Sequence, residues 1–381
     1  MDEQKPTENQ TEDLSEKQTE SQIKKHAGNQ ESSKKQKETA REWIKKHPII
    51  TTIISGLIVT VVGNVITEKV LGPDNPNDDT IPYVTFMSDN MQVFQMSKKI
   101  KTLEYSVGGK SWEKLGTQSV SFGGNYGKLM IRGKNKKGTV IYSNRRYSST
   151  EAATISFVTN AEVICSGDIR TLVDYKHYDK AETSEAKFIK LFSGCKQLVV
   201  APELPAMDLA EECYSSMFAG CSSLKIAPEL PAKKLTASCY SFMFTNCTSL
   251  KKTPELPAEK LANSCYTYMF SGCTSLTSAS KLPADTLADY CYSGMFTGCI
   301  SLYAPITLPA THLAKYCYQD MLSGCSSINQ ITMLAKEVVD NQCLRLLGGV
   351  SPSGVFYKNR NATWSNDGIV PEGWTVKLID Y

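Results

Sequence analysis

Apolar and polar residues in the C-terminal half of the chain recur with a period of 26. In the unit that begins at Cys213, the apolar positions are spaced i, i+4, i+5, i+8, i+9 and i+12. This spacing is typical of the buried face of an amphipathic α-helix. It predicts one helix in every unit, with these residues on its apolar face: Leu209, Cys213, Tyr214, Met217, Phe218 and Cys221.

Each predicted helix is followed by a turn residue and then by a short apolar segment. Glycine at 220, 272, 298 and 324, with Asn246 in the remaining unit, suits a positive φ at a helix C-terminus. A leucine four residues later opens a segment interrupted by prolines, so any strand there is about three residues long. The pattern predicts an α/β leucine-rich-repeat solenoid of 26-residue units over 187–347, with 348–381 as a C-terminal cap.

Cysteine follows the same period, because twelve of the thirteen cysteines form two series through the repeats. Two cysteines eight residues apart on one helix would be separated by about 12 Å, which is too far for a disulfide. The spacing is not that of zinc ligands either. We expect free thiols packed as small apolar groups in the core. The two series are Cys213, Cys239, Cys265, Cys291, Cys317 and Cys343, and Cys195, Cys221, Cys247, Cys273, Cys299 and Cys325.

The repeated units resemble a known family. Their shared pattern, MFxGCxSLxxxPELPAxxLAxxCY, is similar to the BspA-like leucine-rich repeats of bacterial surface proteins, over residues 187–347. The resemblance implies a curved right-handed solenoid and an adhesive or ligand-binding role. It implies no catalytic residue.

An uncharged apolar segment near the N-terminus predicts a membrane span. The nineteen residues from Pro48 to Ile66 carry no charge and would extend about 28 Å as a helix, so residues 48–71 are expected to form a transmembrane helix. Basic residues precede it, which places 1–47 in the cytoplasm as a disordered tail and the C-terminal domains in the periplasm or outside the cell. Residues 72–80 are expected to form a polar linker. The alternative interpretation of the apolar segment is a buried core helix.

Residues 81–186 show a different pattern, with short alternating segments separated by glycine-rich turns. Such segments predict a small antiparallel β domain, followed by a junction with the repeats. The expected strands are 83–86, 91–96, 102–107, 119–122, 128–132 and 154–158.

This β domain is strongly basic. Residues 98–146 contain twelve lysines and arginines but only two acidic residues, whereas the whole chain has a formal net charge of +3. Such asymmetry indicates attraction to an anionic lipid or polysaccharide, and the alternative is a merely solvated surface. The candidate patch consists of Lys128, Arg132, Lys134, Lys136, Lys137, Arg145 and Arg146.

No motif in the chain indicates catalysis. The four histidines are scattered, and none belongs to a recognisable metal or nucleophile motif. The glycine pairs at 108–109 and 123–124 precede no helix signal, so they are expected in hairpin turns. We therefore expect no catalytic residue, no cofactor and no metal.

Positions at which the repeats disagree are the candidates for ligand contact, because the invariant positions serve packing. One such column lies three residues after the first cysteine of each unit, and another follows the constant leucine. Unconstrained drift would explain the same variation. The candidate surface consists of Ser216, Phe242, Tyr268, Asp320, Lys225, Lys251 and Tyr303.

These observations support two hypotheses about function. The first is a membrane-anchored, non-enzymatic repeat protein that binds a protein or glycan at the cell envelope and serves adhesion. The alternative is a membrane-tethered sensor whose repeats face the cytosol or relay ligand binding to the tail. No nucleic-acid partner is expected in either case.

Overall fold

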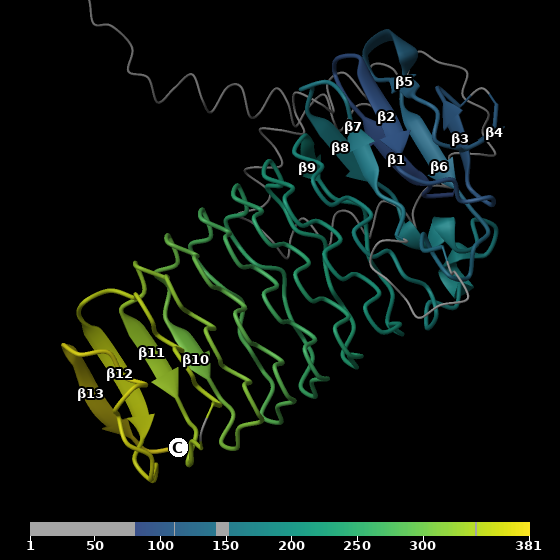
Figure 1. Cartoon of the computed structure of the whole chain (residues 1–381). Coiled ribbons are helices and arrows are strands. Elements are labelled where there is room, and N and C mark those ends of the chain that lie inside the picture. Colours follow the sequence, from purple (N-terminus) through teal and green to yellow (C-terminus); the bar gives the residue numbers. More distant parts are fainter. Residues whose placement is uncertain (1–80, 110, 142–151, 340) are drawn as a thin grey trace, which may run out of the picture. The chain divides into compact units, whose positions relative to one another are not determined.

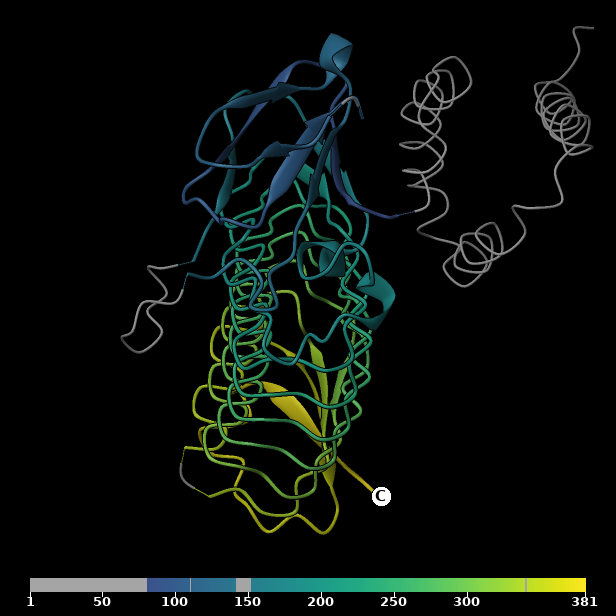
Figure 2. The ribbon, with the colours of Figure 1, turned by 90° about the vertical axis from the view of Figure 1, so that its right-hand side faces the viewer.

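The computed structural model describes residues 81–381 except 110, 142–151 and 340. All described residues belong to one unit of the chain, Asp74–Tyr381. Within this unit the repeats wind as successive coils stacked one on the next, as two perpendicular views show (Figures 1 and 2).

Most coils contain a ten-residue run of linked turns, of which 211–220 is an example. The amides alternate between two kinds of partner. The Cys213 and Ser215 amides donate to carbonyls three residues earlier, those of Ala210 and Glu212, at 3.2 and 3.0 Å. The Tyr214 amide instead donates to the Cys239 carbonyl of the next coil, at 2.9 Å. Odd-numbered amides therefore close turns within a coil, and even-numbered amides join it to its neighbour.

A positive φ recurs at every fourth residue of this run. Glu212, Ser216 and Gly220 have φ angles of 57°, 54° and 76°, and the corresponding residues of the other coils repeat the conformation. The positive φ expected at glycines 220, 272, 298 and 324 and at Asn246 is confirmed. This conformation belongs to the turn series, however, and caps no helix.

The predicted helix in each repeat is therefore wrong, and so is the α/β class assigned to the solenoid. Among the described residues, the only helices are short 3₁₀ helices, at Gly124–Tyr126 (η1), Ile169–Leu172 (η3) and Tyr178–Lys180 (η4). An α-helix turns by about 40° more than a full rotation every four residues, so it keeps positions i, i+4 and i+8 within one apolar stripe. A turn series that repeats every four residues directs the same positions inward without drift. The apolar spacing fits both structures.

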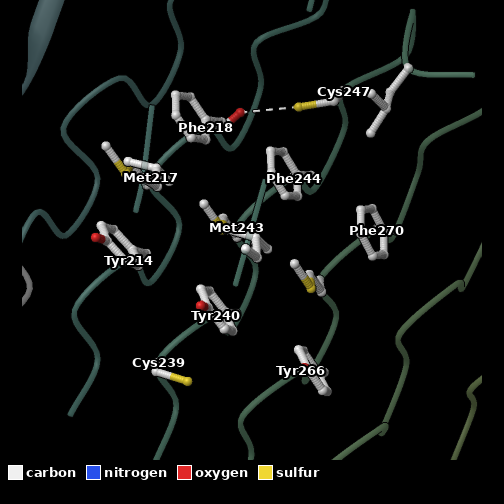
Figure 3. Packing of buried hydrophobic residues seen from close by; sticks show 14 of the residues in the cluster. Tyr214, Met217, Phe218, Cys239, Tyr240, Met243, Phe244, Cys247, Tyr266 and Phe270 are labelled. Atoms are coloured by element: carbon white, nitrogen blue, oxygen red, sulfur yellow. Dashed lines mark hydrogen bonds between the residues drawn. The ribbon is translucent and has the colours of Figure 1, made fainter. Parts of the chain in front are cut away.

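Stacking in register converts each repeat position into a column through the core. Tyr214, Tyr240 and Tyr266 are buried and stack with ring centroids 5.9–6.0 Å apart. The phenylalanines four residues later stack in the same way, with the Phe218 and Phe244 centroids 5.6 Å apart (Figure 3). Each aromatic pair contributes about 0.5–1.5 kcal/mol beyond its area burial. The columns thus stabilise the stacking that forms them.

The cysteines form two further columns, and all thirteen are free and buried, as predicted. In the column that contains Cys247, the thiols also donate hydrogen bonds. The Cys247 Sγ lies 3.2 Å from the Phe218 carbonyl oxygen (Figure 3). The Cys273 Sγ lies 3.1 Å from the Phe244 carbonyl oxygen. The Phe244 oxygen also accepts from the Cys247 amide of its own coil, at 3.0 Å. This cysteine column therefore links neighbouring coils through side chains as well as through packing.

A β sandwich precedes the coils. One sheet has the order β4-β3-β6-β1-β8-β9 and the other β5-β2-β7. Phe86, Phe94 and Phe157 pack between the sheets, with ring centroids 5.5–6.3 Å apart. Six of these strands, β1, β2, β3, β5, β6 and β7, overlap the segments predicted from the alternation, whereas those segments do not include β4, β8 or β9. Their bounds are Val84–Met87 (β1), Gln92–Met96 (β2), Glu104–Val107 (β3), Glu113–Lys114 (β4), Val120–Phe122 (β5), Leu129–Arg132 (β6), Ile155–Phe157 (β7), Val163–Ser166 (β8) and Leu198–Val200 (β9).

The sandwich and the solenoid share a sheet and a core. The strand β9 belongs to the first coil and pairs in parallel with β8 of the sandwich. Phe86 of the sandwich and Phe192 of the first coil have ring centroids 6.2 Å apart. The sandwich therefore covers the apolar N-terminal end of the coil stack.

A parallel sheet forms along the last coils, in the order β10-β11-β12-β13. Its strands are Ile306–Leu308 (β10), Gln330–Met333 (β11), Gly354–Asn359 (β12) and Trp374–Ile379 (β13). Buried side chains also donate hydrogen bonds between coils in this part of the core. The Asn359 amide donates to the Leu334 carbonyl at 3.1 Å, and the Trp364 indole N–H donates to that of Ala335 at 2.9 Å.

The prediction of a single-pass membrane protein is contradicted. In the part of the chain that the structure describes, no helix has the length and apolar character needed to cross a membrane. The predicted transmembrane segment 48–71, like the predicted tail and linker, lies outside the described residues. The predicted location at the cell envelope and the predicted membrane orientation depended on this helix, so both predictions are withdrawn.

The positive φ of the turn series gives a test at Gly298. A Cβ at Gly298 would meet no atom closer than 3.9 Å, so an alanine there is disfavoured by backbone conformation alone. We expect Gly298→Ala to lower the free energy of unfolding by about 1–2 kcal/mol. Gly298→Asn should cost less, because Asn246 adopts the same conformation with a φ of 60° in another coil. Urea unfolding of both variants checks this, and equal losses would contradict it.

The two cysteine columns give a second test. The Cys265 thiol donates to no oxygen among the described residues, whereas the Cys273 thiol is 3.1 Å from the Phe244 carbonyl. We expect Cys265→Ser to destabilise the protein by about 1–3 kcal/mol, since it buries a hydroxyl without an acceptor. Cys273→Ser should cost less, because its hydroxyl can donate to the Phe244 carbonyl. Urea unfolding is the measurement, and a larger loss for Cys273→Ser would refute the assignment.

Candidate functional site

The outward side of the turn series carries a cluster of aromatic residues that the core does not use. We call it the aromatic face and define it by Phe242, Tyr268, Tyr290 and Tyr316. Phe242 and Tyr290 expose 40% and 38% of their surface, and Tyr268 and Tyr316 are half-buried. All four have positive φ, between 51° and 57°. The turn conformation that directs the buried columns inward thus places these side chains at the surface.

The four rings form two stacked pairs on neighbouring coils. The Phe242 and Tyr268 rings lie 5.3 Å apart between centroids with an interplanar angle of 9°. The Tyr290 and Tyr316 rings lie 4.7 Å apart at 21°. The Thr267 hydroxyl, next to Tyr268, donates to the Tyr290 carbonyl at 2.7 Å and so joins the coils of the two pairs.

Gly294 makes room for the Tyr268 ring. It occupies the position of the next coil that corresponds to Tyr268, with a φ of 61°. A Cβ built on Gly294 would lie 2.2–2.6 Å from three carbons of the Tyr268 ring. The ring therefore covers the glycine, and a side chain at 294 would displace it.

An ion pair continues the column beyond this glycine. The Arg345 Nε and Nη2 atoms each lie 2.8 Å from an oxygen of Asp320, so the contact is bidentate. The hydrogen bond and charge of Asp320 raise the pKa of Arg345 above its ordinary value. Asp320 is buried, and Arg345 is largely exposed. Asp320 and Arg345 therefore neutralise each other.

The structure separates the two columns that the sequence offered as a ligand surface. Ser216, Phe242, Tyr268 and Asp320 belong to the column just described. Lys225 and Lys251 are exposed in the second column, and the Lys225 ammonium lies 3.7 Å from a carboxylate oxygen of Glu162. Tyr303 is 63% exposed, and no aromatic ring among the described residues stacks on it.

The candidate basic patch is partly neutralised by internal contacts. The guanidinium of Arg132 packs over the Trp112 and Tyr175 rings, at 3.8 and 4.3 Å from their centroids, and pairs with Glu104 at 3.0 Å. Hydrogen bonds from Lys114 and then from Arg132 lower the pKa of Glu104. Arg132 therefore serves the fold of the sandwich.

The other members of the patch differ in their contacts and exposure. Lys134 lies 5.3 Å from the Tyr175 ring centroid, and Lys137 is 3.6 Å from Glu185. Lys128 is half-buried and Lys136 is exposed, whereas Arg145 and Arg146 lie outside the described residues. The described residues thus do not form a continuous unpaired basic surface.

The sequence contained a signal for the two residues of the aromatic face that the prediction missed. Tyr290 and Tyr316 lie one residue before the first cysteine of their units, where Glu212 and serines stand in other units. This column also varies between repeats, but only the structure places it beside the column of Tyr268.

The buried thiols lack the properties of reactive cysteines. Burial raises the pKa of Cys273 to about 12, and burial raises that of Cys221 well above its ordinary value. The thiolate is the nucleophilic form, so these groups are weak nucleophiles near neutral pH. The described residues contain no group of three or more histidines, cysteines and acidic residues arranged to hold a metal ion.

Comparison of the chain with protein-family models, curated proteins and solved structures yields no match.

The contact between Gly294 and Tyr268 gives a test of the aromatic face. Gly294→Ala places an alanine at an unfavourable φ and also brings its Cβ into the Tyr268 ring, whereas Gly298→Ala introduces only the unfavourable φ. We therefore expect Gly294→Ala to lower the free energy of unfolding by about 1 kcal/mol more than Gly298→Ala. The additional variant Tyr268→Ala should abolish that difference. A difference that persists without the tyrosine would show that the ring does not cover the glycine.

Proposed function

We propose that this chain is a non-enzymatic binding protein whose solenoid recognises a protein partner through the aromatic face. The observation that carries the proposal is the gathering of four aromatic side chains on the outer turns of neighbouring coils. The hot spots of protein interfaces are enriched in tryptophan, tyrosine and arginine. Here they lie at positions where the repeats disagree, so the packing of the coils does not require them.

The charges of the face support a protein partner. The centre of a protein interface is depleted of charged residues and enriched in aromatic residues and arginine. Asp320 and Arg345 neutralise each other beside the rings, and the Lys315 ammonium lies 5.3 Å from the Tyr316 ring centroid. A partner can therefore cover Asp320 and Arg345 without separating either charge from its counter-ion.

The division of each coil into core positions that the repeats share and exposed positions that vary supports the same conclusion. The tyrosine, methionine, phenylalanine and cysteine columns are buried and provide the core. In a solenoid, sequence variation at exposed positions adapts one scaffold to different partners. The resemblance of the units to BspA-like repeats, which implies ligand binding, agrees with this proposal.

Substitution of the face tests the proposal. Once a partner is captured on immobilised full-length protein, Tyr268→Ala and Tyr290→Ala should each raise its dissociation constant about fivefold or more. Tyr303→Ala is the matched control, because this tyrosine is exposed and lies outside the face. Circular dichroism and the thermal midpoint establish that the variants fold.

Three results would count against the proposal. Undiminished binding by the double variant of Tyr268 and Tyr290 would place the contact elsewhere on the chain. A loss of the same size in Tyr303→Ala would show that the aromatic face has no special role. If a neutral polysaccharide binds and the two face variants abolish its binding, the face is a glycan site and the protein partner is refuted.

A further inference from the structure

The last strand of the C-terminal sheet has one open edge. The strand β13 pairs with β12 over six residues, from Trp374 to Ile379, and it is the outermost strand of its sheet (Figure 1). No strand within the described ranges pairs with its other edge. An unpaired edge offers a row of backbone donors and acceptors to another chain.

One hydrogen bond shows which backbone groups of β13 point toward β12 and which point toward the open edge. The Ile379 carbonyl accepts from the Arg360 amide at 2.9 Å, so it points toward the β12 side. Backbone groups of a strand alternate in direction from residue to residue, and those of Thr375 and Lys377 therefore also point toward β12. The amides and carbonyls of Val376 and Leu378 point toward the open edge.

This edge has few of the features that protect exposed strands. Protected edges are short, or carry outward charges, proline or a bulge. The strand β13 has six residues without proline, and the ammonium of its one charged residue, Lys377, lies 6.0 Å from the Tyr357 ring of β12. By contrast, the edge strand β4 of the sandwich is two residues long, Glu113 and Lys114, and both are exposed. Among the described residues, the short and charged edge strand β4 is therefore better protected against pairing than β13.

One side of β13 is apolar and incompletely covered. Trp374, Val376 and Leu378 share this side, since alternate residues of a strand point the same way. Val376 is in register with the buried Phe356 of β12, which identifies the side that faces the core. Leu378 is nonetheless 51% exposed. A further strand on the open edge would extend the cover over this residue.

We propose that β13 pairs antiparallel with β13 of a second copy of this chain, about a twofold axis through Val376. This register brings Val376 opposite its own counterpart and Trp374 opposite Leu378, so the apolar sides of the two strands become continuous. On the other side, Lys377 faces Thr375 of the second copy. A twofold axis through Lys377 would instead place the two lysines directly opposite each other, which is unfavourable. The same surface serves both copies, as a twofold interface requires.

Charge changes at Thr375 test both the dimer and its register. Thr375 is exposed, and its backbone groups point toward β12, so substitution of its side chain leaves the sheet of one copy intact. In the proposed register residue 375 faces Lys377 twice per dimer. We expect Thr375→Glu to lower the dissociation constant of the dimer about threefold or more, and Thr375→Lys to raise it by a similar factor. Sedimentation equilibrium of the full-length chain over a range of concentrations measures both.

Proline at 376 provides an independent test. The Val376 amide points toward the open edge, so Val376→Pro removes a donor from the interface and none from the pairing with β12. We expect this variant to be monomeric with a thermal midpoint close to that of the unmodified protein. If it unfolds, the two Thr375 variants still decide the question. A monomer at all concentrations, or a dimer that responds alike to Thr375→Glu and Thr375→Lys, would overturn the proposal.

Discussion

The alternation of backbone hydrogen bonds along each turn series is the constraint on which the rest of this structure depends. One amide closes a turn within its own coil and the next donates to the following coil, as Ser215 and Ser216 do at 3.0 and 2.8 Å. Each backbone donor is thereby satisfied without a helix or a long strand, as buried amides require. Because the links between coils recur at every second residue, neighbouring coils are held in register over the whole run. The columns of identical side chains follow from this register.

The same alternation requires a left-handed backbone conformation at every fourth residue, and non-glycine residues adopt it in most coils. Ser238, Tyr290 and Asn246 do so with φ angles between 55° and 60°. The conformation costs a residue such as Ser238 or Tyr290 about 1–2 kcal/mol, and an asparagine less. Stacked aromatic pairs and thiol hydrogen bonds, repeated in successive coils, offset this cost. The outward direction of the left-handed residues also leaves their side chains free for recognition, so one backbone rule accounts for the core and for the aromatic face.

The sequence predicts the repeat, its boundaries in each coil and the burial of its cysteines, but not the local conformation. Met217 and Phe218 follow Cys213 at intervals that fit an α-helix and a four-residue turn series equally well. The choice between helix and turn series depends on whether the backbone amides donate within one coil or to the next coil. The pattern of apolar residues within one unit does not show which carbonyls accept these hydrogen bonds. The column of Phe242 and Tyr268 could be found from disagreement between repeats. Its proximity to Tyr290 could not, because it depends on how adjacent coils align.

Circular dichroism of residues 74–381, which form one compact unit, tests the turn series most directly. Helices in every repeat would produce the double minimum of the α-helix in the far ultraviolet. The hydrogen-bond alternation described for these coils predicts a spectrum without that double minimum, dominated by strands and turns. A helical spectrum that disappears cooperatively with the unfolding of this unit would contradict the account.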